Sequence, residues 1–215
     1  MANSKDGRSV AGKVFAIADA FSGGDALTLA EVQRRTGLPR STAHRLLTEW
    51  VAWEGLEHGE DGRYRVGLKL WQLGIRQPTA RRLRAIARPV LAELLEVSHE
   101  HVHLAVRDGL GVVYLERLSA PDAVALVTDV GSRVPLHATA VGQVLLAFAE
   151  PSVLDEALAE GLSGFTANTI VAENVLRRRL SEIRAVGVGS SREEFTPGAF
   201  SVAAPVYDVT GSVVA

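Results

Sequence analysis

The sequence predicts an α+β protein made of two parts that differ in pattern and in charge. Residues 1–75 show helical periodicity followed by one short hairpin, whereas the region after residue 98 mixes strand-like and helix-like segments. Residues 1–88 carry 15 Lys and Arg and 9 Asp and Glu, a net charge of +6, while residues 89–215 carry 8 and 16, a net charge of −8. This asymmetry indicates that only the first part meets a polyanion, with chance segregation of charge as the alternative.

The composition supports a folded chain and excludes several kinds of site. Of the 215 residues, 47% are hydrophobic and 22% are charged, which is ordinary for a globular protein. There is no cysteine, which excludes disulfides, thiolate zinc sites, iron–sulfur clusters and cysteine nucleophiles. The N-terminus lacks the apolar core of a signal peptide, and no apolar run approaches the ~18 residues of a membrane span. We therefore expect a cytoplasmic protein without a membrane partner.

The first part begins with two predicted helices. Apolar residues recur at helical spacing over residues 10–21, and a Ser-Gly-Gly stretch follows. Thr28 and Glu31 then have the spacing of a capping box, in which each side chain accepts a hydrogen bond from the other residue's backbone N–H. The short helix that this box opens is predicted over residues 29–35, and Gly37 suits the left-handed position after its end.

A third helix, predicted from Pro39 to Trp53, has one apolar side and one polar side. The apolar side consists of Ala43, Leu46, Leu47 and Trp50. The other side presents donors and cations, and the residues predicted to contact DNA there are Arg40, Ser41, Thr42, His44 and Arg45. Two helices joined by a short glycine turn are typical of a helix-turn-helix, whose second helix enters the major groove with its N-terminal residues against the base edges.

A hairpin is predicted directly after the third helix. Residues 56–58 and 63–66 have strand patterns, and an Asp-Gly turn signal lies between them. Alternation places Arg63 and Arg65 on one face, where two guanidinium groups beside the third helix would hold DNA phosphates. The alternative is a helical bundle that never contacts DNA. The capping box, the polar helix face and the basic hairpin together favour a winged helix-turn-helix.

The rest of the chain predicts a helical connector followed by a mixed domain. The connector covers residues 76–98: residues 77–79 are expected to break the helix before them, and residues 81–97 keep helical spacing. Pro89 is expected to kink or restart this helix because it cannot donate to the carbonyl of Ala85. The connector arginines are interpreted as a solvated face, with DNA backbone contacts as the alternative. Strands are predicted at 101–107, 112–117, 123–130 and 201–207, and helices at 141–148, 152–160 and 173–186. Such a mixture implies an α+β domain.

Several stretches resemble one protein family, the isocitrate lyase regulator (IclR) family of bacterial transcription factors. The stretches are Thr36–Thr42, His44–Leu47, Gly62–Gly67, Val130–Phe148, Thr166–Ile170 and Glu193–Ala215. The resemblance implies an N-terminal winged helix-turn-helix domain joined by a helix to a GAF-like α+β effector-binding domain with a central antiparallel sheet. The expected bounds are 1–75, 76–98 and 99–215. The last domain is expected to be incomplete at its C-terminus, because the family continues with a further strand and helix.

The resemblance also implies a function, that of a ligand-responsive transcriptional regulator, for example a repressor, and not an enzyme. It implies palindromic double-stranded operator DNA, a homodimer or homotetramer, a small organic acid or aromatic metabolite as effector, and no cofactor. The residues that it places at the effector are Ala138, Thr139, Ser191, Ser201 and Ala203. Gln143 and Ser201 stand where the family usually has lysine and cysteine. The residues alone instead favour 137–139 as the cap of the following helix.

One motif points to a different chemistry. The segment His99-Glu100-His101-Val102-His103 fits H-E-x-x-H, the pattern of a zinc protease when it lies on a helix. Here apolar and polar residues alternate from residue 101, which predicts a strand, and a strand would separate His99 from His103 by about 13 Å. These two side chains could not share one tetrahedral ion, so we expect no metal site and no catalytic residue. A zinc metallohydrolase, and a sensor or scaffold that binds no DNA, are the alternative functions.

Overall fold

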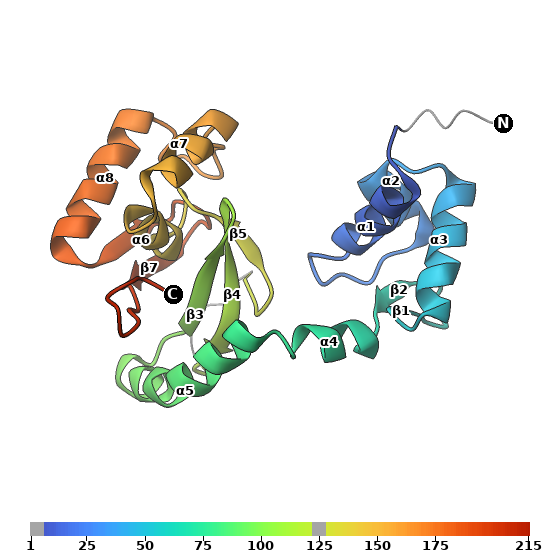
Figure 1. Cartoon of the computed structure of the whole chain (residues 1–215), viewed down its shortest axis with the longest axis horizontal. Helices are drawn as coiled ribbons and strands as arrows, with labels where there is room; N and C mark the ends of the chain where they lie inside the picture. The colour runs from blue at the N-terminus through green and yellow to red at the C-terminus, as the bar shows by residue number, and fades with distance from the viewer. Residues whose placement is uncertain (1–6, 122–127) are drawn as a thin grey trace. The chain divides into compact units, whose positions relative to one another are not determined.

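The computed structural model describes residues 7–121 and 128–215. Its contacts divide the chain into two compact units, residues 1–82 and 83–215. Figure 1 follows the chain through both units, from the N-terminus in blue to the C-terminus in red. None of the helices in the described ranges is long and apolar enough to cross a membrane.

The first unit is a winged helix-turn-helix built around one apolar core. Its elements are α1 (Val10–Ala20), α2 (Leu29–Thr36), α3 (Arg40–Ala52), β1 (Leu56–His58), β2 (Tyr64–Val66) and α4 (Leu68–Gly74). The core takes buried side chains from α1, α2, α3 and both strands, among them Ile17, Val32, Leu46, Leu47, Leu56 and Tyr64. A backbone pairing between Leu27 and Tyr64 fastens the hairpin to the segment before α2. The arrangement predicted from periodicity is therefore confirmed.

Local chemistry fixes the ends of α2 and the start of α3. Thr28 N donates to Glu31 Oε2 at 2.7 Å and Glu31 N donates to Thr28 Oγ1 at 3.3 Å, so the predicted capping box forms. Gly37 follows α2 with φ 70°, a left-handed conformation that glycine adopts at little cost. Pro39 lies just before α3 instead of forming its first residue. Its fixed φ still directs the chain into the helix.

The second unit combines antiparallel sheets with helices, which is the α+β class expected. Helix α5 (Pro78–Ser98) crosses the division between the units. The elements after it are β3 (Val102–Asp108), β4 (Gly111–Leu118), β5 (Arg133–Pro135), α6 (Ala140–Ala147), α7 (Pro151–Glu160), α8 (Glu173–Val186), β6 (Gly189–Arg192) and β7 (Phe200–Ala203). One sheet has the order β3-β4-β5 and the other pairs β6 with β7, and every pairing is antiparallel.

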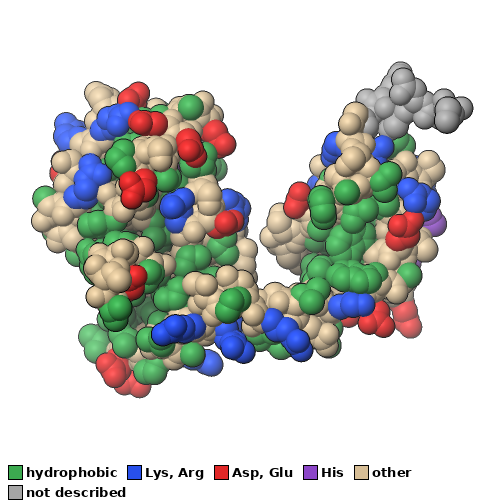
Figure 2. Space-filling view, in the orientation of Figure 1, with side chains coloured by type: hydrophobic (Ala, Val, Ile, Leu, Met, Phe, Trp, Pro, Cys, Tyr) green, Lys and Arg blue, Asp and Glu red, His purple; other side chains and the backbone are tan. Residues whose placement is uncertain are grey.

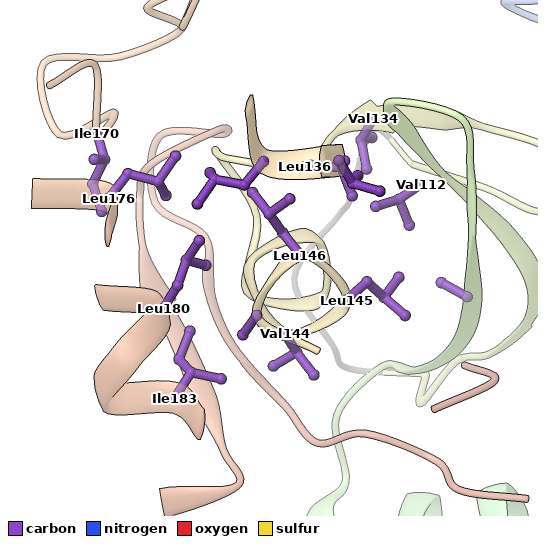
Figure 3. Close-up of a cluster of buried hydrophobic side chains, with 14 of the residues drawn as sticks. Val112, Val134, Leu136, Val144, Leu145, Leu146, Ile170, Leu176, Leu180 and Ile183 are labelled. Carbon is purple, nitrogen blue, oxygen red and sulfur yellow. The ribbon is translucent and has the colours of Figure 1, made fainter. Parts of the chain in front are cut away.

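Helix α6 lies at the centre of the second unit. Figure 3 shows its leucines and Val144 between strand side chains on one side and apolar side chains of α8 on the other. All of its residues except Val141 are buried, which explains why its sequence is apolar on every side. Burying each such leucine stabilises the fold by roughly 1.5–3 kcal/mol. Gly142 allows the close approach, because a Cβ there would lie 2.4 Å from the carbonyl oxygen of Leu136.

Helix α5 is held against the three-stranded sheet by apolar and ionic contacts. Leu91 and Leu104 share a second apolar cluster. Arg84 Nε and Nη2 both donate to Glu116 Oε2 at 3.2 Å, and the Glu116 side chain is nearly buried. Lys and Arg side chains gather over α4 and α5 in the face that Figure 2 shows. Arg81, Arg82 and Arg88 are exposed, as interpreted from the sequence, whereas Arg84 is half-buried and is not part of the solvated face.

The structure differs from the predicted elements at four places. The predicted strand over 123–130 lies mostly outside the described residues, and residues 128–130 form no strand. The predicted strand over 201–207 is shorter, over 200–203. Strands β5 and β6 were not predicted, because they hold only 3 and 4 residues and β6 is rich in Gly and Ser. Helix α5 does not restart at Pro89, since losing one hydrogen bond is offset by apolar contacts such as that of Leu91.

Candidate nucleic-acid interface and effector site

The polar side of α3 is presented to solvent over a buried apolar side. Ala43, Leu46 and Leu47 are at most 1% exposed. On the opposite side, Ser41, His44, Arg45 and Thr48 are exposed, as is Arg40 at the N-terminal end, while Thr42 is half-buried. The first turn of α3 has no side-chain cap from Pro39. The predicted DNA-contacting side chains of this helix are thus brought together on one accessible surface.

Arg45 makes one contact along this surface. Its Nη1 lies 2.6 Å from Glu49 Oε1, one helical turn away, and both side chains are more than half exposed. An exposed pair of this kind contributes only ~0.3–0.5 kcal/mol, because water screens both charges. The guanidinium can therefore exchange Glu49 for another acceptor at little cost.

The two arginines of the wing have different surroundings. Arg65 Nη1 and Nη2 each donate to a carboxylate oxygen of Asp61, Nη1 at 3.1 Å, within the hairpin. These hydrogen bonds, together with one from the backbone N–H of Arg63, lower the pKa of Asp61 to about 2. Arg65 is exposed at the surface. It remains available to a phosphate, although its charge is partly balanced by Asp61.

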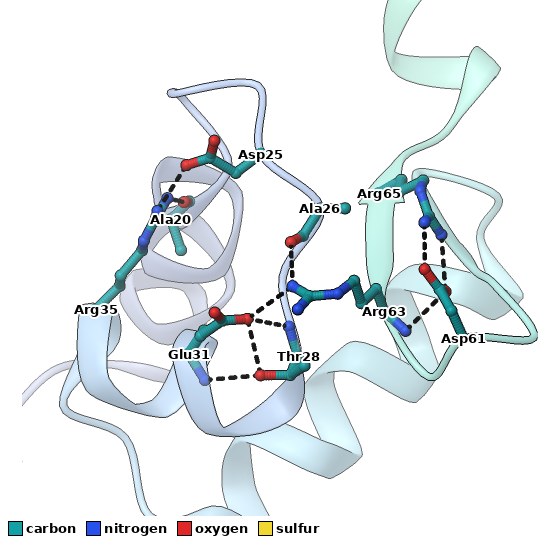
Figure 4. A network of polar contacts seen from close by, with 9 residues as sticks. All are labelled: Ala20, Asp25, Ala26, Thr28, Glu31, Arg35, Asp61, Arg63 and Arg65. Atoms are coloured by element: carbon teal, nitrogen blue, oxygen red, sulfur yellow. Dashed lines mark hydrogen bonds and ion pairs between the residues drawn. The ribbon is translucent and has the colours of Figure 1, made fainter.

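Arg63 is joined to the helix-turn-helix itself, as Figure 4 shows. Its Nη1 donates to the carbonyl of Ala26 at 2.9 Å and lies 3.2 Å from the carboxylate of Glu31, the residue that closes the capping box. Sequence alternation placed Arg63 and Arg65 on one face. It did not reveal that the pairing of Leu27 with the hairpin brings Arg63 against the start of α2.

Two of the expected effector residues, Ala138 and Thr139, lie in the loop between β5 and α6, called the signature loop, and are buried around the start of α6. Ala138 is fully buried, and Thr139 is the N-cap of α6. Thr139 Oγ1 accepts from Gly142 N at 3.1 Å and donates to the carbonyl of Pro135 at 3.3 Å. The hydroxyl therefore performs the capping role that the residues alone favoured.

The other expected effector residues lie on the β6–β7 hairpin. Ser191 and Ser201 are register partners across the two strands, and Ala203 is the partner of Gly189. Ser191 is buried, Ala203 is half-buried and Ser201 is exposed. Ser191 and Ser201 are 10 residues apart in the sequence, and the hairpin places their hydroxyl-bearing side chains next to each other.

A buried polar network, which the sequence did not predict, lies beside these residues. Gln143 is fully buried, and its Nε2 donates to the carbonyl of His137 at 2.9 Å and to Glu194 Oε2 at 2.5 Å. Glu194 follows another glutamate, a pattern typical of a solvated turn, but it is only 5% exposed. Arg179 approaches its other carboxylate oxygen at 4.0 Å. The available signal was a glutamine in an otherwise apolar helix, which required a polar partner.

The H-E-x-x-H segment runs from the end of α5 into β3. His99 follows the end of α5 with φ 55°, whereas His103 lies within β3. No helix therefore carries both, as predicted. Within residues 7–121 and 128–215, no group of three or more His, Cys, Asp or Glu side chains is arranged to hold a metal ion. Burial, assisted by the nearby charges of Arg117 and His101, lowers the pKa of His103 to about 4.

Comparison with known proteins covers both units. Residues 10–57 match the model of the IclR helix-turn-helix domain, and residues 78–215 match that of the bacterial transcriptional regulator IclR C-terminal domain. The HTH-type transcriptional repressor AllR of Escherichia coli strain K12 is 32% identical over 196 residues, which span 90% of this chain and 72% of AllR. The glycerol operon regulatory protein of Streptomyces coelicolor is 34% identical over 184 residues, which span 85% of this chain and 72% of that protein.

Solved structures give the same result. An IclR homolog of Microbacterium hydrocarbonoxydans, crystallised in complex with 4-hydroxybenzoate, is similar with a TM-score of 0.84 and 34% identity. That similarity covers 96% of this chain and 86% of the homolog. The IclR protein of Thermotoga maritima is similar with a TM-score of 0.68 and 30% identity, over 94% of this chain and 83% of that one.

Proposed function

Because the chain belongs to the IclR family of bacterial transcriptional regulators, we propose that it binds palindromic operator DNA as a homodimer or homotetramer under the control of a small organic acid or aromatic metabolite. It is a regulator with a helix-turn-helix DNA-binding domain and a C-terminal ligand-binding domain. Residues 1–75, 76–98 and 99–215 are the proposed DNA-binding domain, connector and effector domain. Cytoplasmic location and the absence of a cofactor and of catalytic residues are part of the proposal.

The observation that carries the DNA-binding part is the exposed polar side of α3 opposite the buried side chains of Ala43, Leu46 and Leu47. In the proposed complex, the N-terminal half of α3 lies in the major groove. Arg40, Ser41, Thr42, His44 and Arg45 are the proposed contacts of this helix. Arg45 reads a base edge, because an arginine can donate two hydrogen bonds to guanine. Arg65 contacts phosphate. Arg63 can contact phosphate only if its hydrogen bonds to Glu31 and to the carbonyl of Ala26 are broken.

The effector part rests on the β6–β7 hairpin and the start of α6. Ala138, Thr139, Ser191, Ser201 and Ala203 are the proposed contacts, and the opposed hydroxyls of Ser191 and Ser201 support them. An aromatic acid suits the proposal because a homolog is known in complex with 4-hydroxybenzoate. The ligand changes operator affinity only as far as it binds the DNA-competent and DNA-incompetent states differently.

The proposal is tested by selecting bound sequences from random DNA with the full chain. The expected product is a palindrome with half-sites about 10 base pairs, or a multiple of that, apart. Affinity for the selected and a scrambled duplex is then measured at two salt concentrations, and the mass of the free protein by light scattering. Equal affinity for both duplexes, or no binding at either salt concentration, would favour a sensor or scaffold that does not act on DNA.

A further inference from the structure

A polar cluster on the three-stranded sheet of the second unit has no part in the proposed function. His101 and His103 are two residues apart at the start of β3, and their rings are 6.3 Å apart. Side chains two residues apart along a strand lie on the same side of a sheet. Arg117 of β4 is the register partner of His103, and the ring of Tyr114 packs against His103 with 4.9 Å between centroids. Four side chains that can donate hydrogen bonds therefore meet on one face.

This face is the one that looks away from α5. On the α5 side, Leu104 joins the apolar cluster of Leu91, and Glu116 is paired with Arg84. Tyr114 belongs instead to the core that surrounds α6. Tyr114 and Glu116 are two residues apart and yet lie on opposite faces, because the β-bulge opposite Leu104 and Ala105 inserts one extra residue between them. The polar cluster therefore lies beside the apolar core that surrounds α6.

His103 and Arg117 have hydrogen-bonding capacity that the described residues do not use. The Nε2 of His103 is buried and has no hydrogen-bond partner among the residues described. Arg117 Nε donates to Ser119 Oγ at 3.0 Å and Nη1 to the carbonyl of Thr128 at 2.9 Å, so within the described ranges its Nη2 stays available. A buried polar atom without a partner is uncommon in folded proteins and indicates an absent water or ligand.

The sign of the local charge decides which ligand fits. Burial and the permanent positive charge of Arg117 lower the pKa of His103, which is therefore neutral at neutral pH, whereas Asp129 acts in the opposite direction. A divalent metal ion would be repelled here. A carboxylate would receive charge-assisted hydrogen bonds from Arg117 and a hydrogen bond from His103.

We propose that His103 and Arg117, flanked by His101 and Tyr114, form an anion-binding subsite that takes the carboxylate of the effector. The inference rests on the proposed function only in that the effector is an organic acid. An anion beside His103 stabilises the imidazolium, so binding takes up a proton, and affinity increases as the pH is lowered below the pKa of bound His103 for as long as the ligand carboxylate stays ionised. The groups that face this imidazole, His101, Arg117, Tyr114 and Asp129, set the size of the effect.

The subsite is tested on the full chain by NMR of the histidine ring protons and by calorimetry. The probes are acetate, 4-hydroxybenzoate and the neutral analogue 4-hydroxybenzamide. Both acids are expected to shift the NMR signals of His103 and to raise the pKa of its imidazole. 4-Hydroxybenzoate is expected to bind about tenfold more tightly, or better, than 4-hydroxybenzamide. Arg117→Gln is expected to lower affinity for 4-hydroxybenzoate about tenfold while affinity for the amide is retained. Arg107→Gln, on the exposed end of β3, is the matched control and leaves both affinities unchanged.

Three results would overturn the subsite: His103 signals that no acid moves, equal affinity of wild type and Arg117→Gln for 4-hydroxybenzoate, or a response of His103 to Zn²⁺ alone. Binding to the selected operator is measured on the same samples. If the protein still binds the operator and responds to an uncharged metabolite, while no acid binds at His103, the proposed subsite is wrong and the proposed regulatory function still stands. Loss of all sequence preference in the wild type would instead reject the proposed function.

Discussion

The guanidinium of Arg63 lies 3.2 Å from the carboxylate of Glu31, and this contact joins the wing to the start of α2. The same carboxylate accepts hydrogen bonds from the backbone and hydroxyl of Thr28, so one acidic group serves both the capping box and the wing. Arg65, two residues along, pairs with Asp61 inside its own hairpin. The two wing arginines are therefore expected to differ in what they do.

Arg63→Ala is expected to lower the free energy of unfolding of the first unit by about 1 kcal/mol, because a partly exposed ion pair and one hydrogen bond are lost. Arg65→Ala is expected to leave it near the wild-type value. Trp50, Trp53 and Trp71 all lie in the first unit, so tryptophan fluorescence during urea unfolding reports on that unit alone. Equal destabilisation by the two substitutions would show that the contact with Glu31 has no special role.

Arg65→Ala is expected to act on DNA binding instead. A phosphate contact contributes to affinity for any sequence and releases a counterion, so its loss should reduce the slope of log affinity against log salt by about 1. The measurement is fluorescence anisotropy with selected and scrambled duplexes over a range of salt concentrations. A slope equal to that of the wild type would mean that Arg65 stays with Asp61 in the complex.

Arg45→Ala is expected to remove sequence preference. Loss of a bidentate contact to a base should cost about 1–3 kcal/mol on the selected operator and much less on scrambled DNA. Glu49→Gln is the matched control, because it removes the partner of Arg45 along α3 and leaves the guanidinium in place. We expect this control to bind as tightly as the wild type or more tightly. An equal loss on both duplexes for Arg45→Ala would assign this residue to phosphate.

Glu31 gives the first unit a dependence on pH. Hydrogen bonds from the backbone and side chain of Thr28, with smaller effects of the Arg63 and Arg34 charges, hold the pKa of Glu31 below its ordinary value of 4.5. A carboxyl with a lower pKa in the folded state stabilises the fold above its unfolded pKa, and this stabilisation is lost as the pH falls through the folded pKa. We therefore expect the free energy of unfolding to decrease as the pH is lowered from about 4.5. Part of this decrease is due to Glu31 and should be absent in Glu31→Gln.

Asp61 provides the control for this pH dependence. Its stabilisation is lost as the pH falls from its ordinary pKa of 3.8 through its folded pKa of about 2, a window that begins at lower pH than that of Glu31, whose ordinary pKa is 4.5. Asp61→Asn should therefore alter the pH profile mainly toward its acidic end. Urea unfolding followed by tryptophan fluorescence between about pH 6 and pH 2 separates the two. Parallel profiles for wild type and Glu31→Gln would contradict the role given to the capping box.

Much of the first unit could be predicted because its signals are local. The capping box, Gly37 and the apolar stripe of α3 depend on residues within a few positions of one another, and each formed as predicted. The contact between Arg63 and Glu31 joins residues 32 positions apart, and no local pattern encodes it. The resemblance to a family supplied the proposed effector residues, and local pattern alone favoured a helix cap for Thr139, one of them.

In the second unit the failures have a similar cause. Strands β5 and β6 are too short to show alternation, and their existence depends on partners elsewhere in the chain. A pair of adjacent glutamates is typical of a solvated turn, but Glu194 is buried because Gln143 of α6, 51 positions away, provides its partner. Burial of a carboxylate is decided by such a tertiary partner and not by neighbouring charge.

The contact between Gln143 and Glu194 yields the last prediction. Gln143→Leu removes the donor to Glu194 and to the carbonyl of His137, leaving a carboxylate buried without that partner. We expect a loss of about 2–3 kcal/mol in the stability of the second unit. Gln143→Lys keeps a donor and should cost less. Because this unit has no tryptophan, the measurement is amide hydrogen exchange of α6 and α8.

The controls for Gln143 separate the hydrogen bond from the change in side-chain shape. Gln72→Leu makes the same chemical change at an exposed position of α4 and should leave exchange in α6 and α8 unchanged. Adding Glu194→Leu to Gln143→Leu should restore part of the lost protection, since replacing both partners by apolar groups removes the unpaired carboxylate. If the double variant exchanges as fast as the sum of the two single changes requires, the two residues are not coupled, and the buried network does not hold the signature loop to the β6–β7 hairpin.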